Sequence, residues 1–295
     1  MPSKSASCAS RSMLRAYRTN SLGTRSELVS PESSRATPRS PSHRYHALIA
    51  DLSEVEALIA GAEAETRRLL EDVRRLGDDD VRSSSSLPGW TRGHVLTHLA
   101  RNADAQARLL AGALRDERVE QYQGGLVGRA AEIEERAHRP ARALRQDVEQ
   151  SAERLRSIWQ LMSVDTWERP AAGAIAGERP AWATVWARWS EVSIHHVDLA
   201  IGYTPSHWSL EFVDRVIRRS LPRTKSRLIA DEGISITAPD LGLSWESSPS
   251  PGIQVQGPSY AIVAWLAGRT GPWLELVSTS RGGVSASLPR VKPWA

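Results

Sequence analysis

The most informative feature of this 295-residue chain is its lack of cysteine, since Cys8 is the only one. A disulfide within the chain is therefore impossible, and so is a structural zinc site built from several thiolates. If Cys8 lies outside the folded part, no cysteine nucleophile is available inside it. Chemistry that needs a thiol would have to take it from another molecule.

Long apolar runs are also missing. No stretch approaches the roughly 18 consecutive apolar residues that a membrane-spanning helix needs, and there is no apolar core of a secretory signal. We therefore expect a cytoplasmic protein that does not bind membranes. With 40% hydrophobic and 24% charged residues, the composition is typical of a folded globular protein.

Acidic residues are scarce only in residues 1–45, which hold Lys4 and seven arginines against Glu27 and Glu32. This segment has a net charge of +6, whereas the whole chain has +4, so the remainder is slightly acidic. The high pI therefore does not indicate a nucleic-acid-binding surface on the folded part. We expect residues 1–45 to be a disordered, basic Ser/Arg-rich extension; a transit peptide is a weaker alternative.

Residues 46–205 show helical spacing of apolar residues. We expect four helices, over about 54–76, 91–114, 140–161 and 182–201, which together favour a helical bundle. Residues 124–128 are expected to link two helices, and residues 170–180 to form a loop.

Residues 206–290 change character, and period-two alternation at 234–237, 241–245 and 253–256 predicts strands. Short helices are expected at 210–221 and 258–268, with a last strand at 274–277. The predicted fold class is α+β, with a helical bundle followed by a small α+β domain.

The fourth expected helix is apolar around most of its circumference, yet it contains Glu191 and His195. A buried carboxylate needs a compensating partner, and residues four apart lie on one face of a helix. These two side chains could hold a metal ion together with a third ligand from another helix. His98 is the candidate, because it lies among apolar positions, whereas His94 is expected to be exposed.

Two histidines and a glutamate with open positions are typical of a catalytic zinc site. Nickel, cobalt or ferrous iron could use the same ligands. A Glu/His pair at this spacing is also common as an ordinary hydrogen-bonded pair. Asp198 is a candidate for orienting a ligand histidine; the alternative is that it anchors a helix end.

The segment Leu87-Pro88-Gly89-Trp90-Thr91-Arg92-Gly93-His94-Val95-Leu96-Thr97-His98-Leu99 resembles the first metal-binding motif of mycothiol-dependent maleylpyruvate isomerases. Trp189-Ser190-Glu191-Val192-Ser193-Ile194-His195-His196-Val197-Asp198-Leu199 resembles the second. Likeness continues at 129–133, 202–205 and 265–269 and covers about residues 47–290. Two ordered motifs about 90 residues apart are more specific than either alone.

The resemblance implies a DinB-like metal-binding bundle, with His98, Glu191 and His195 as zinc ligands, and a C-terminal domain similar to sterol-carrier proteins. It also implies that Arg269 contributes to catalysis. The implied cofactors are zinc or another divalent metal and mycothiol, a low-molecular-weight thiol of actinobacteria. Its thiolate would add to the double bond of maleylpyruvate and, after rotation, leave to give fumarylpyruvate.

The residues leave several functions open. The first hypothesis is a mycothiol-dependent isomerase, and a mycothiol S-transferase needs the same activated thiolate. A non-catalytic metal-binding sensor or partner protein is a hypothesis of a different class. We expect a small-molecule substrate and a low-molecular-weight thiol as partners, and no nucleic acid.

Overall fold

The computed structural model describes residues 52–173, 177–227 and 233–291. The predicted basic extension, residues 1–45, lies outside the described residues. The chain divides into two compact units, with the division between Leu199 and Ala200. Among the described helices, none is long and apolar enough to cross a membrane.

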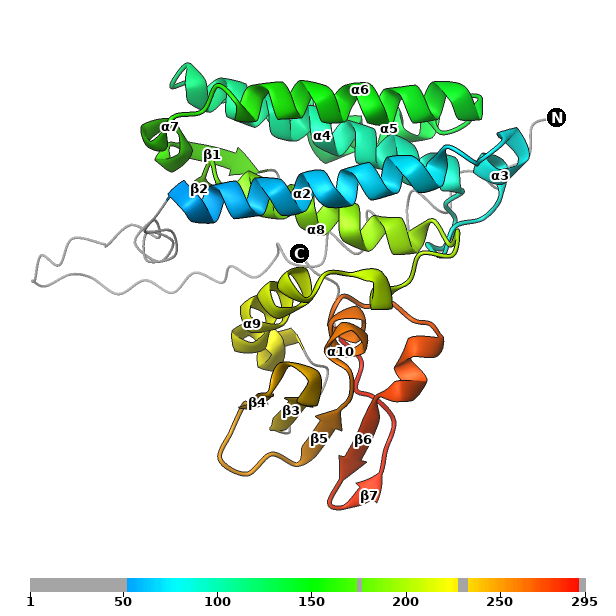
Figure 1. The fold of residues 1–295 in the computed structure, drawn as a ribbon, viewed down its shortest axis with the longest axis vertical. Coiled ribbons are helices and arrows are strands. Elements are labelled where there is room, and N and C mark those ends of the chain that lie inside the picture. The colour runs from blue at the N-terminus through cyan, green and yellow to red at the C-terminus, as the bar shows by residue number, and fades with distance from the viewer. Residues whose placement is uncertain (1–51, 174–176, 228–232, 292–295) are drawn as a thin grey trace, which may run out of the picture. The chain divides into compact units, whose positions relative to one another are not determined.

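The first unit is built around four long helices that run alongside one another (Figure 1). They are α2 (Leu52–Val73), α4 (Arg92–Leu114), α6 (Ala141–Trp159) and α8 (Ala183–Asp198). Helix α4 packs mainly against α6 and α8, and α2 packs mainly against α8. Their contacting faces bury large apolar side chains, including Leu58, Leu69, Leu96, Leu99, Leu110, Leu144, Leu155 and Trp189. Burial of this apolar surface is the main force that holds the helices together.

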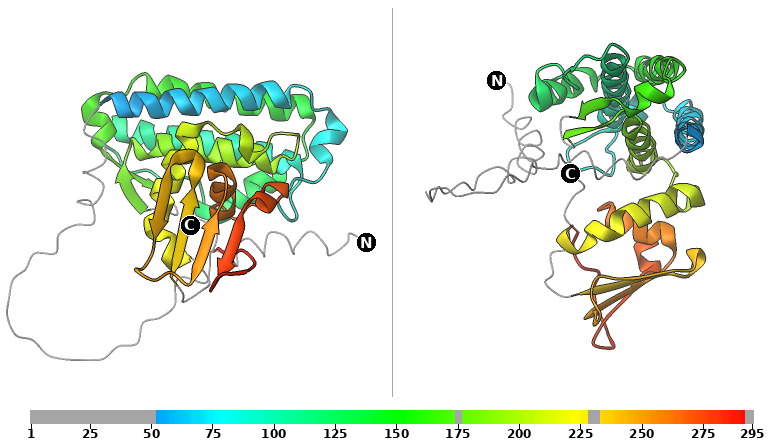
Figure 2. Two further views of the ribbon diagram at one scale, coloured as in Figure 1. Left: turned by 60° about the horizontal axis from the view of Figure 1, so that its bottom comes forward. Right: turned by 90° about the vertical axis from the view of Figure 1, so that its left-hand side faces the viewer.

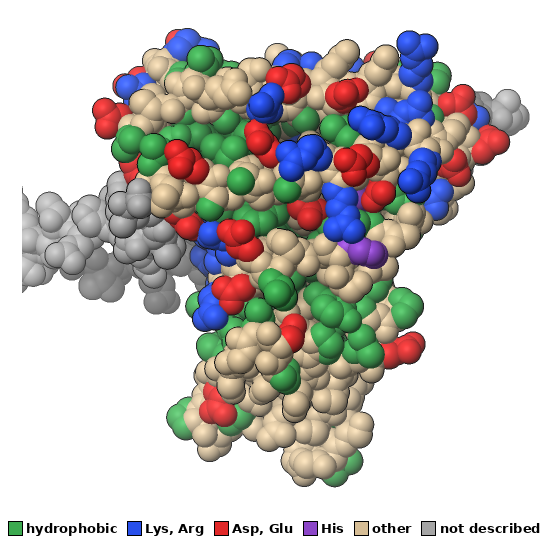
Figure 3. Space-filling model, in the orientation of Figure 1, with side chains coloured by type: hydrophobic (Ala, Val, Ile, Leu, Met, Phe, Trp, Pro, Cys, Tyr) green, Lys and Arg blue, Asp and Glu red, His purple; other side chains and the backbone are tan. Residues whose placement is uncertain are grey.

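Shorter elements connect the four long helices. Helices α3 (Asp78–Arg82) and α7 (Val164–Glu168) are single turns, whereas α5 (Gly125–Arg136) spans twelve residues. Strands β1 (Pro170–Gly173) and β2 (Gly177–Pro180) form an antiparallel hairpin. On the face shown in Figure 3, basic and acidic side chains are interspersed over the helical unit, so neither sign dominates there.

Two glycines set the close approach of neighbouring segments. A Cβ atom at Gly61 of α2 would lie 2.4 Å from the Trp189 ring of α8. A Cβ atom at Gly93, near the start of α4, would lie 2.2 Å from the carbonyl oxygen of Ala137. These contacts are too short for any other residue, so glycine is required where α4 meets the segment after α5.

The second unit is a five-stranded sheet with helices packed on one face, as the right-hand view of Figure 2 shows. The strands are β3 (Ile234–Ala238), β4 (Leu243–Glu246), β5 (Ile253–Gln256), β6 (Ser278–Arg281) and β7 (Val284–Ser285), in the order β4-β3-β5-β6-β7. Only β3 and β5 pair in parallel. Helices α9 (Leu210–Arg227) and α10 (Ser259–Leu266) pack against each other. Short 3-10 turns lie at Pro205–His207, Pro239–Leu241 and Pro272–Leu276.

Alternation places the buried side chains of β3 and β5 on one face of the sheet. Ile234, Ile236 and Ala238 are buried in β3, and Ile253 and Val255 are buried in β5. This is the period-two pattern of a sheet with one covered face.

The α+β fold class, with a helical unit followed by a small α+β unit, is confirmed. Three local predictions were wrong. Residues 124–128 were expected to be a linker, but α5 begins at Gly125. Residues 170–180 were expected to be a loop, but residues 170–173 and 177–180 are the paired strands β1 and β2. The last strand was expected at 274–277, but Pro272 starts a 3-10 turn and the strand begins at Ser278.

Candidate metal centre

Helices α4 and α8 bring His98, Glu191 and His195 together. Nε2 of His98 lies 2.8 Å from Oε2 of Glu191, and Nε2 of His195 lies 3.3 Å from the same oxygen. The two imidazole rings are perpendicular, with centroids 4.5 Å apart. One donor atom from each residue lies within 4.8 Å of the other two. The three predicted ligands therefore converge on one point, as a shared cation requires.

Asp198 holds His195 from the other side. Nδ1 of His195 lies 2.8 Å from Oδ2 of Asp198, which is completely buried. An ionised carboxylate only accepts hydrogen bonds, so Nδ1 donates and Nε2 is directed to Glu191. The backbone oxygen of Asp198 in turn accepts from the Ser86 amide at 2.9 Å. This arrangement matches the expectation that Asp198 orients a candidate ligand.

Arg129 of α5 was not predicted as part of the site, although it stands in a segment that resembles the family. Its Nη2 lies 2.9 Å from Nδ1 of His98. Since an arginine can only donate, Nδ1 of His98 must accept this hydrogen bond. The proton of the neutral ring is therefore on Nε2, which donates to Glu191.

The charge states follow from burial and these contacts. Burial lowers the pKa of His98 to about 3, and the charges of Arg129 and His195 act in the same direction. Burial opposes ionisation of Glu191, but its hydrogen bonds to His98 and His195 keep its pKa well below the ordinary value. Burial also opposes the charged form of His195, yet its bonds to Asp198 and Glu191 raise its pKa. At neutral pH the group therefore offers an ionised carboxylate and a neutral His98.

A second arginine lies close in sequence to Glu191 on α8. Arg188 is 1% exposed and donates to the Leu99 carbonyl oxygen at 2.8 Å and to Oδ1 of Asn102 at 3.1 Å. Burial lowers its pKa to about 10, which Glu191 partly opposes. Arg188 therefore remains charged at neutral pH and compensates part of the negative charge on α8.

Trp90 lies against the histidines of α4. Its ring is stacked on His94 with a centroid separation of 6.0 Å, and it lies 5.8 Å from the ring of His98.

The prediction that His94 is exposed was wrong, since it is 4% exposed. His94 is the third residue of α4, and its Nδ1 lies 2.8 Å from Oγ1 of the N-cap Thr91, so the ring turns inward to complete the helix start.

Arg269 lies in the second unit, directly after α10. Its backbone N–H donates to the Ala264 carbonyl oxygen at 2.9 Å, and its Nη1 donates to the Ala267 carbonyl oxygen at 2.8 Å. These contacts satisfy carbonyl groups at the end of α10. The catalytic role that the resemblance implies for Arg269 stays a prediction.

Comparison with known proteins identifies the first unit. Residues 62–200 match the model of the mycothiol maleylpyruvate isomerase N-terminal domain. Crystal structures of the mycothiol-dependent maleylpyruvate isomerase and of a histidine-to-alanine mutant of that enzyme are each 26% identical to this chain, with a TM-score of 0.72. Each match covers 84% of this chain and 98% of the other. No curated protein sequence matches.

The fold and these likenesses define an enzyme of the α+β class with a helical N-terminal bundle. Its helical unit matches the mycothiol maleylpyruvate isomerase N-terminal domain, and the chain is similar to the solved mycothiol-dependent maleylpyruvate isomerase, so the resemblance seen in its two motifs is confirmed.

Proposed function

We propose that this enzyme is a metal-dependent isomerase that uses mycothiol and acts on maleylpyruvate or a closely related unsaturated dicarboxylate. His98, Glu191 and His195 would hold the metal ion, and zinc suits them best. The observation that carries this proposal is the convergence of these three side chains at one point between α4 and α8.

The donor set fits a catalytic zinc ion. Two imidazole nitrogens and one carboxylate oxygen are ligands that zinc prefers, and three protein ligands leave a position for another molecule. Glu191 is ionised, and His195 is already oriented by Asp198 so that Nε2 faces the site. An orienting carboxylate behind a ligand histidine is the usual support of such centres.

When bound, the metal ion would favour the thiolate form of a thiol at the site. Cys8 is the sole cysteine of the chain and precedes the described residues. None of the residues that build the site therefore supplies sulfur, which supports the use of a small external thiol.

The protein residues would position the reactants and balance charge. The thiolate adds to the activated double bond, the resulting single bond rotates, and the same thiolate leaves, so the substrate and product are isomers. Arg129 places a positive charge 2.9 Å from His98 and suits an anionic substrate. By family resemblance, Arg269 would stabilise the negative charge that develops during addition.

An S-transferase is the runner-up, because it requires the same activated thiolate. The two reactions differ in whether the thiol leaves again or stays attached to the product. Product analysis therefore separates them: an isomerase returns all of its mycothiol, whereas a transferase consumes one mycothiol for each conjugate formed.

The first test compares the wild type with His195→Ala for metal content and for mycothiol-dependent turnover of maleylpyruvate. We expect the wild type to carry metal at this site and to isomerise maleylpyruvate only with mycothiol, and the variant to lose both properties. Metal binding without turnover on unsaturated or electrophilic substrates would instead indicate a non-catalytic binder. Retention of the metal by His195→Ala, Glu191→Ala and His98→Ala would overturn the proposed ligands.

A further inference from the structure

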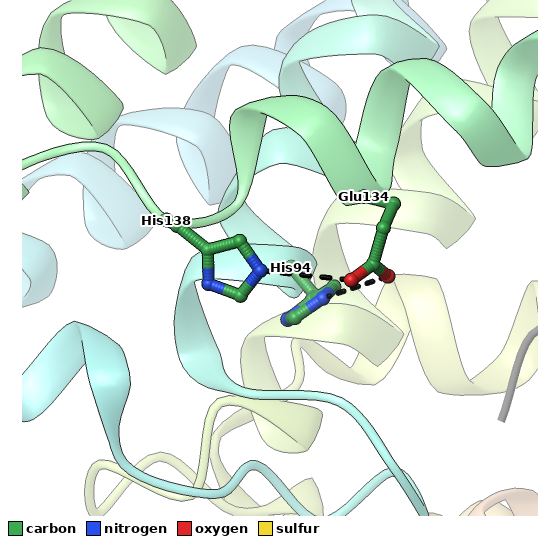
Figure 4. A group of neighbouring side chains, drawn as sticks. All are labelled: His94, Glu134 and His138. Atoms are coloured by element: carbon green, nitrogen blue, oxygen red, sulfur yellow. Dashed lines mark hydrogen bonds and ion pairs between the residues drawn. The ribbon is translucent and has the colours of Figure 1, made fainter. Parts of the chain in front are cut away.

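A second group of possible metal ligands lies at the start of α4, outside the candidate metal centre. Figure 4 shows His94, Glu134 and His138 turned toward one another. Nε2 of His94 lies 3.3 Å from Oε2 of Glu134, and Nε2 of His138 lies 3.6 Å from Oε1 of the same carboxylate. One donor atom of each residue lies within 4.8 Å of the others.

The backbone holds these residues in place. Glu134 is in the last turn of α5, and His138 follows the end of that helix. The close approach of Gly93 to the Ala137 carbonyl oxygen fixes the segment carrying His138 against the start of α4. On the far side, Arg139 donates to the Arg136 carbonyl oxygen at 3.0 Å. The cluster therefore does not depend on a loose loop.

The surroundings also suit a cation. His94 is buried, and burial lowers its pKa despite Glu134, so its ring is neutral at neutral pH. The Thr91 backbone N–H donates to Nδ1 of His94 at 3.1 Å, which holds the ring with Nε2 facing Glu134. A metal ion at Nε2 would require the ring proton to move to Nδ1, where Oγ1 of Thr91, at 2.8 Å, can accept it. Glu134 and His138 are exposed, so water can complete the coordination. They also lie at the C-terminal end of α5, where the helix dipole favours positive charge.

We propose that His94, Glu134 and His138 form a second binding site for a divalent cation such as Zn²⁺. The ion would join the first turn of α4 to the end of α5. Helix α5 also carries Arg129, which contacts His98, so this ion would stabilise the helix that borders the candidate metal centre. The site is built from its own three ligands and does not rest on the proposed isomerase activity.

The test is a titration of the metal-free, full-length protein, without a histidine tag, with Zn²⁺ alone. Four proteins are compared: wild type, His195→Ala, Glu134→Gln and the double variant. We expect two bound ions in the wild type, one in each single variant and none in the double variant. Glu135→Gln, which removes a neighbouring exposed carboxylate of α5, is the matched control and should bind two.

A thermal unfolding measurement provides a second readout. Zn²⁺ should raise the midpoint of unfolding of His195→Ala, since binding to the folded state stabilises it. It should not raise that of the double variant His195→Ala/Glu134→Gln. His138→Ala should reproduce the effect of Glu134→Gln, because both are exposed residues whose replacement leaves the core intact.

The outcomes separate this inference from the proposed function. One ion in the wild type, lost in His195→Ala but retained in Glu134→Gln and His138→Ala, overturns the second site and leaves the proposed metal centre standing. One ion that is lost in Glu134→Gln and retained in His195→Ala supports the second site and overturns the ligands proposed for catalysis. No zinc binding by the wild type overturns both.

Discussion

Two groups of possible metal ligands meet at helix α4, which contributes His94 to one and His98, one turn later, to the other. Each group combines two imidazoles with one glutamate. In the group of His98, Glu191 and His195, a buried aspartate orients one ring and an arginine contacts the other. In the group of His94, Glu134 and His138, only His94 is buried and the other two side chains face solvent. The ligand types are the same, so any difference in role between the two groups would have to come from their surroundings.

Those surroundings differ mainly in electrostatics. Glu191 is held between two imidazoles and close to a charged Arg188, so a change there alters a set of mutually dependent charges. Glu134 is largely solvated, where interactions between charges are weak. The first group is therefore suited to changing the reactivity of a bound molecule, and the second to tying two segments together.

The largest expected difference between the groups is in catalysis. Glu191→Ala should lower mycothiol-dependent turnover by at least about 100-fold, as removal of a key electrostatic group usually does. Glu134→Ala should change it by less than about threefold, since it touches only the second group. Steady-state rates at saturating zinc measure both. Comparable losses in the two variants would show that the groups do not differ in role.

Orientation of His195 by Asp198 should produce the next largest effect. Asp198→Asn keeps the side-chain shape but loses the charge that holds Nδ1–H, so zinc affinity at the first group should fall about 10- to 100-fold. Asp72→Asn is the matched control, because Asp72 of α2 lies 3.1 Å from His196, the neighbour of His195 on α8, and so pairs with a histidine outside the first group. Competition with a zinc-binding dye measures both. An equal loss in Asp72→Asn would indicate a general structural defect.

Acid sensitivity of the metal-free protein should reflect the neutral state of His98. Its pKa is about 3 in the folded protein and 6.5 as a free side chain, so below pH 6.5 the unfolded chain takes up a proton that the folded chain does not. This group therefore lowers the free energy of unfolding by up to about 1.4 kcal/mol per pH unit as the pH falls from 6.5 to about 5.

Urea unfolding with a chelator at several pH values in this range measures that slope. His98→Gln should have a shallower slope than the wild type. His94→Gln should change it in the same direction, because burial lowers the pKa of His94 as well. An unchanged slope in His98→Gln would mean that His98 takes up its proton over the same pH range in the folded and unfolded chains.

The smallest expected effect concerns Arg129. Arg129→Gln should increase zinc affinity at the first group several-fold, because it removes a like charge next to the cation. Glutamine can also accept an Nδ1–H bond from His98, which arginine cannot do. Arg136→Gln, elsewhere on α5, is the control and should leave affinity unchanged. Weaker zinc binding by Arg129→Gln would contradict this electrostatic role.

Much of the fold could be predicted from local sequence patterns. The four long helices have continuous apolar spacing, and the strands at 234–238 and 253–256 alternate clearly. Helix α5 was missed because Gly124, Gly125 and Gly128 stand at its start and suggest a linker. The strand expected at 274–277 was wrong because these alternating residues mostly belong to a 3-10 turn that begins at Pro272.

Part of the candidate metal centre could also be predicted from local sequence patterns. Glu191, His195 and Asp198 lie on one helix, so their mutual spacing can be read from sequence, and His98 could be matched by its apolar neighbours. Arg129 and the Glu134–His138 pair belong to the missed helix and the segment after it, so their approach to α4 depends on packing. The burial of His94 depends on the same packing, through Gly93 and Ala137.

The position of Trp90 close to both His94 and His98 has an optical consequence. Because its indole lies against both rings, a paramagnetic ion such as Co²⁺ bound at either group would quench its fluorescence. The difference in emission between the wild type and Trp90→Phe isolates this one indole from the other ten tryptophans. A single side chain thus makes the filling of both groups visible without any added dye.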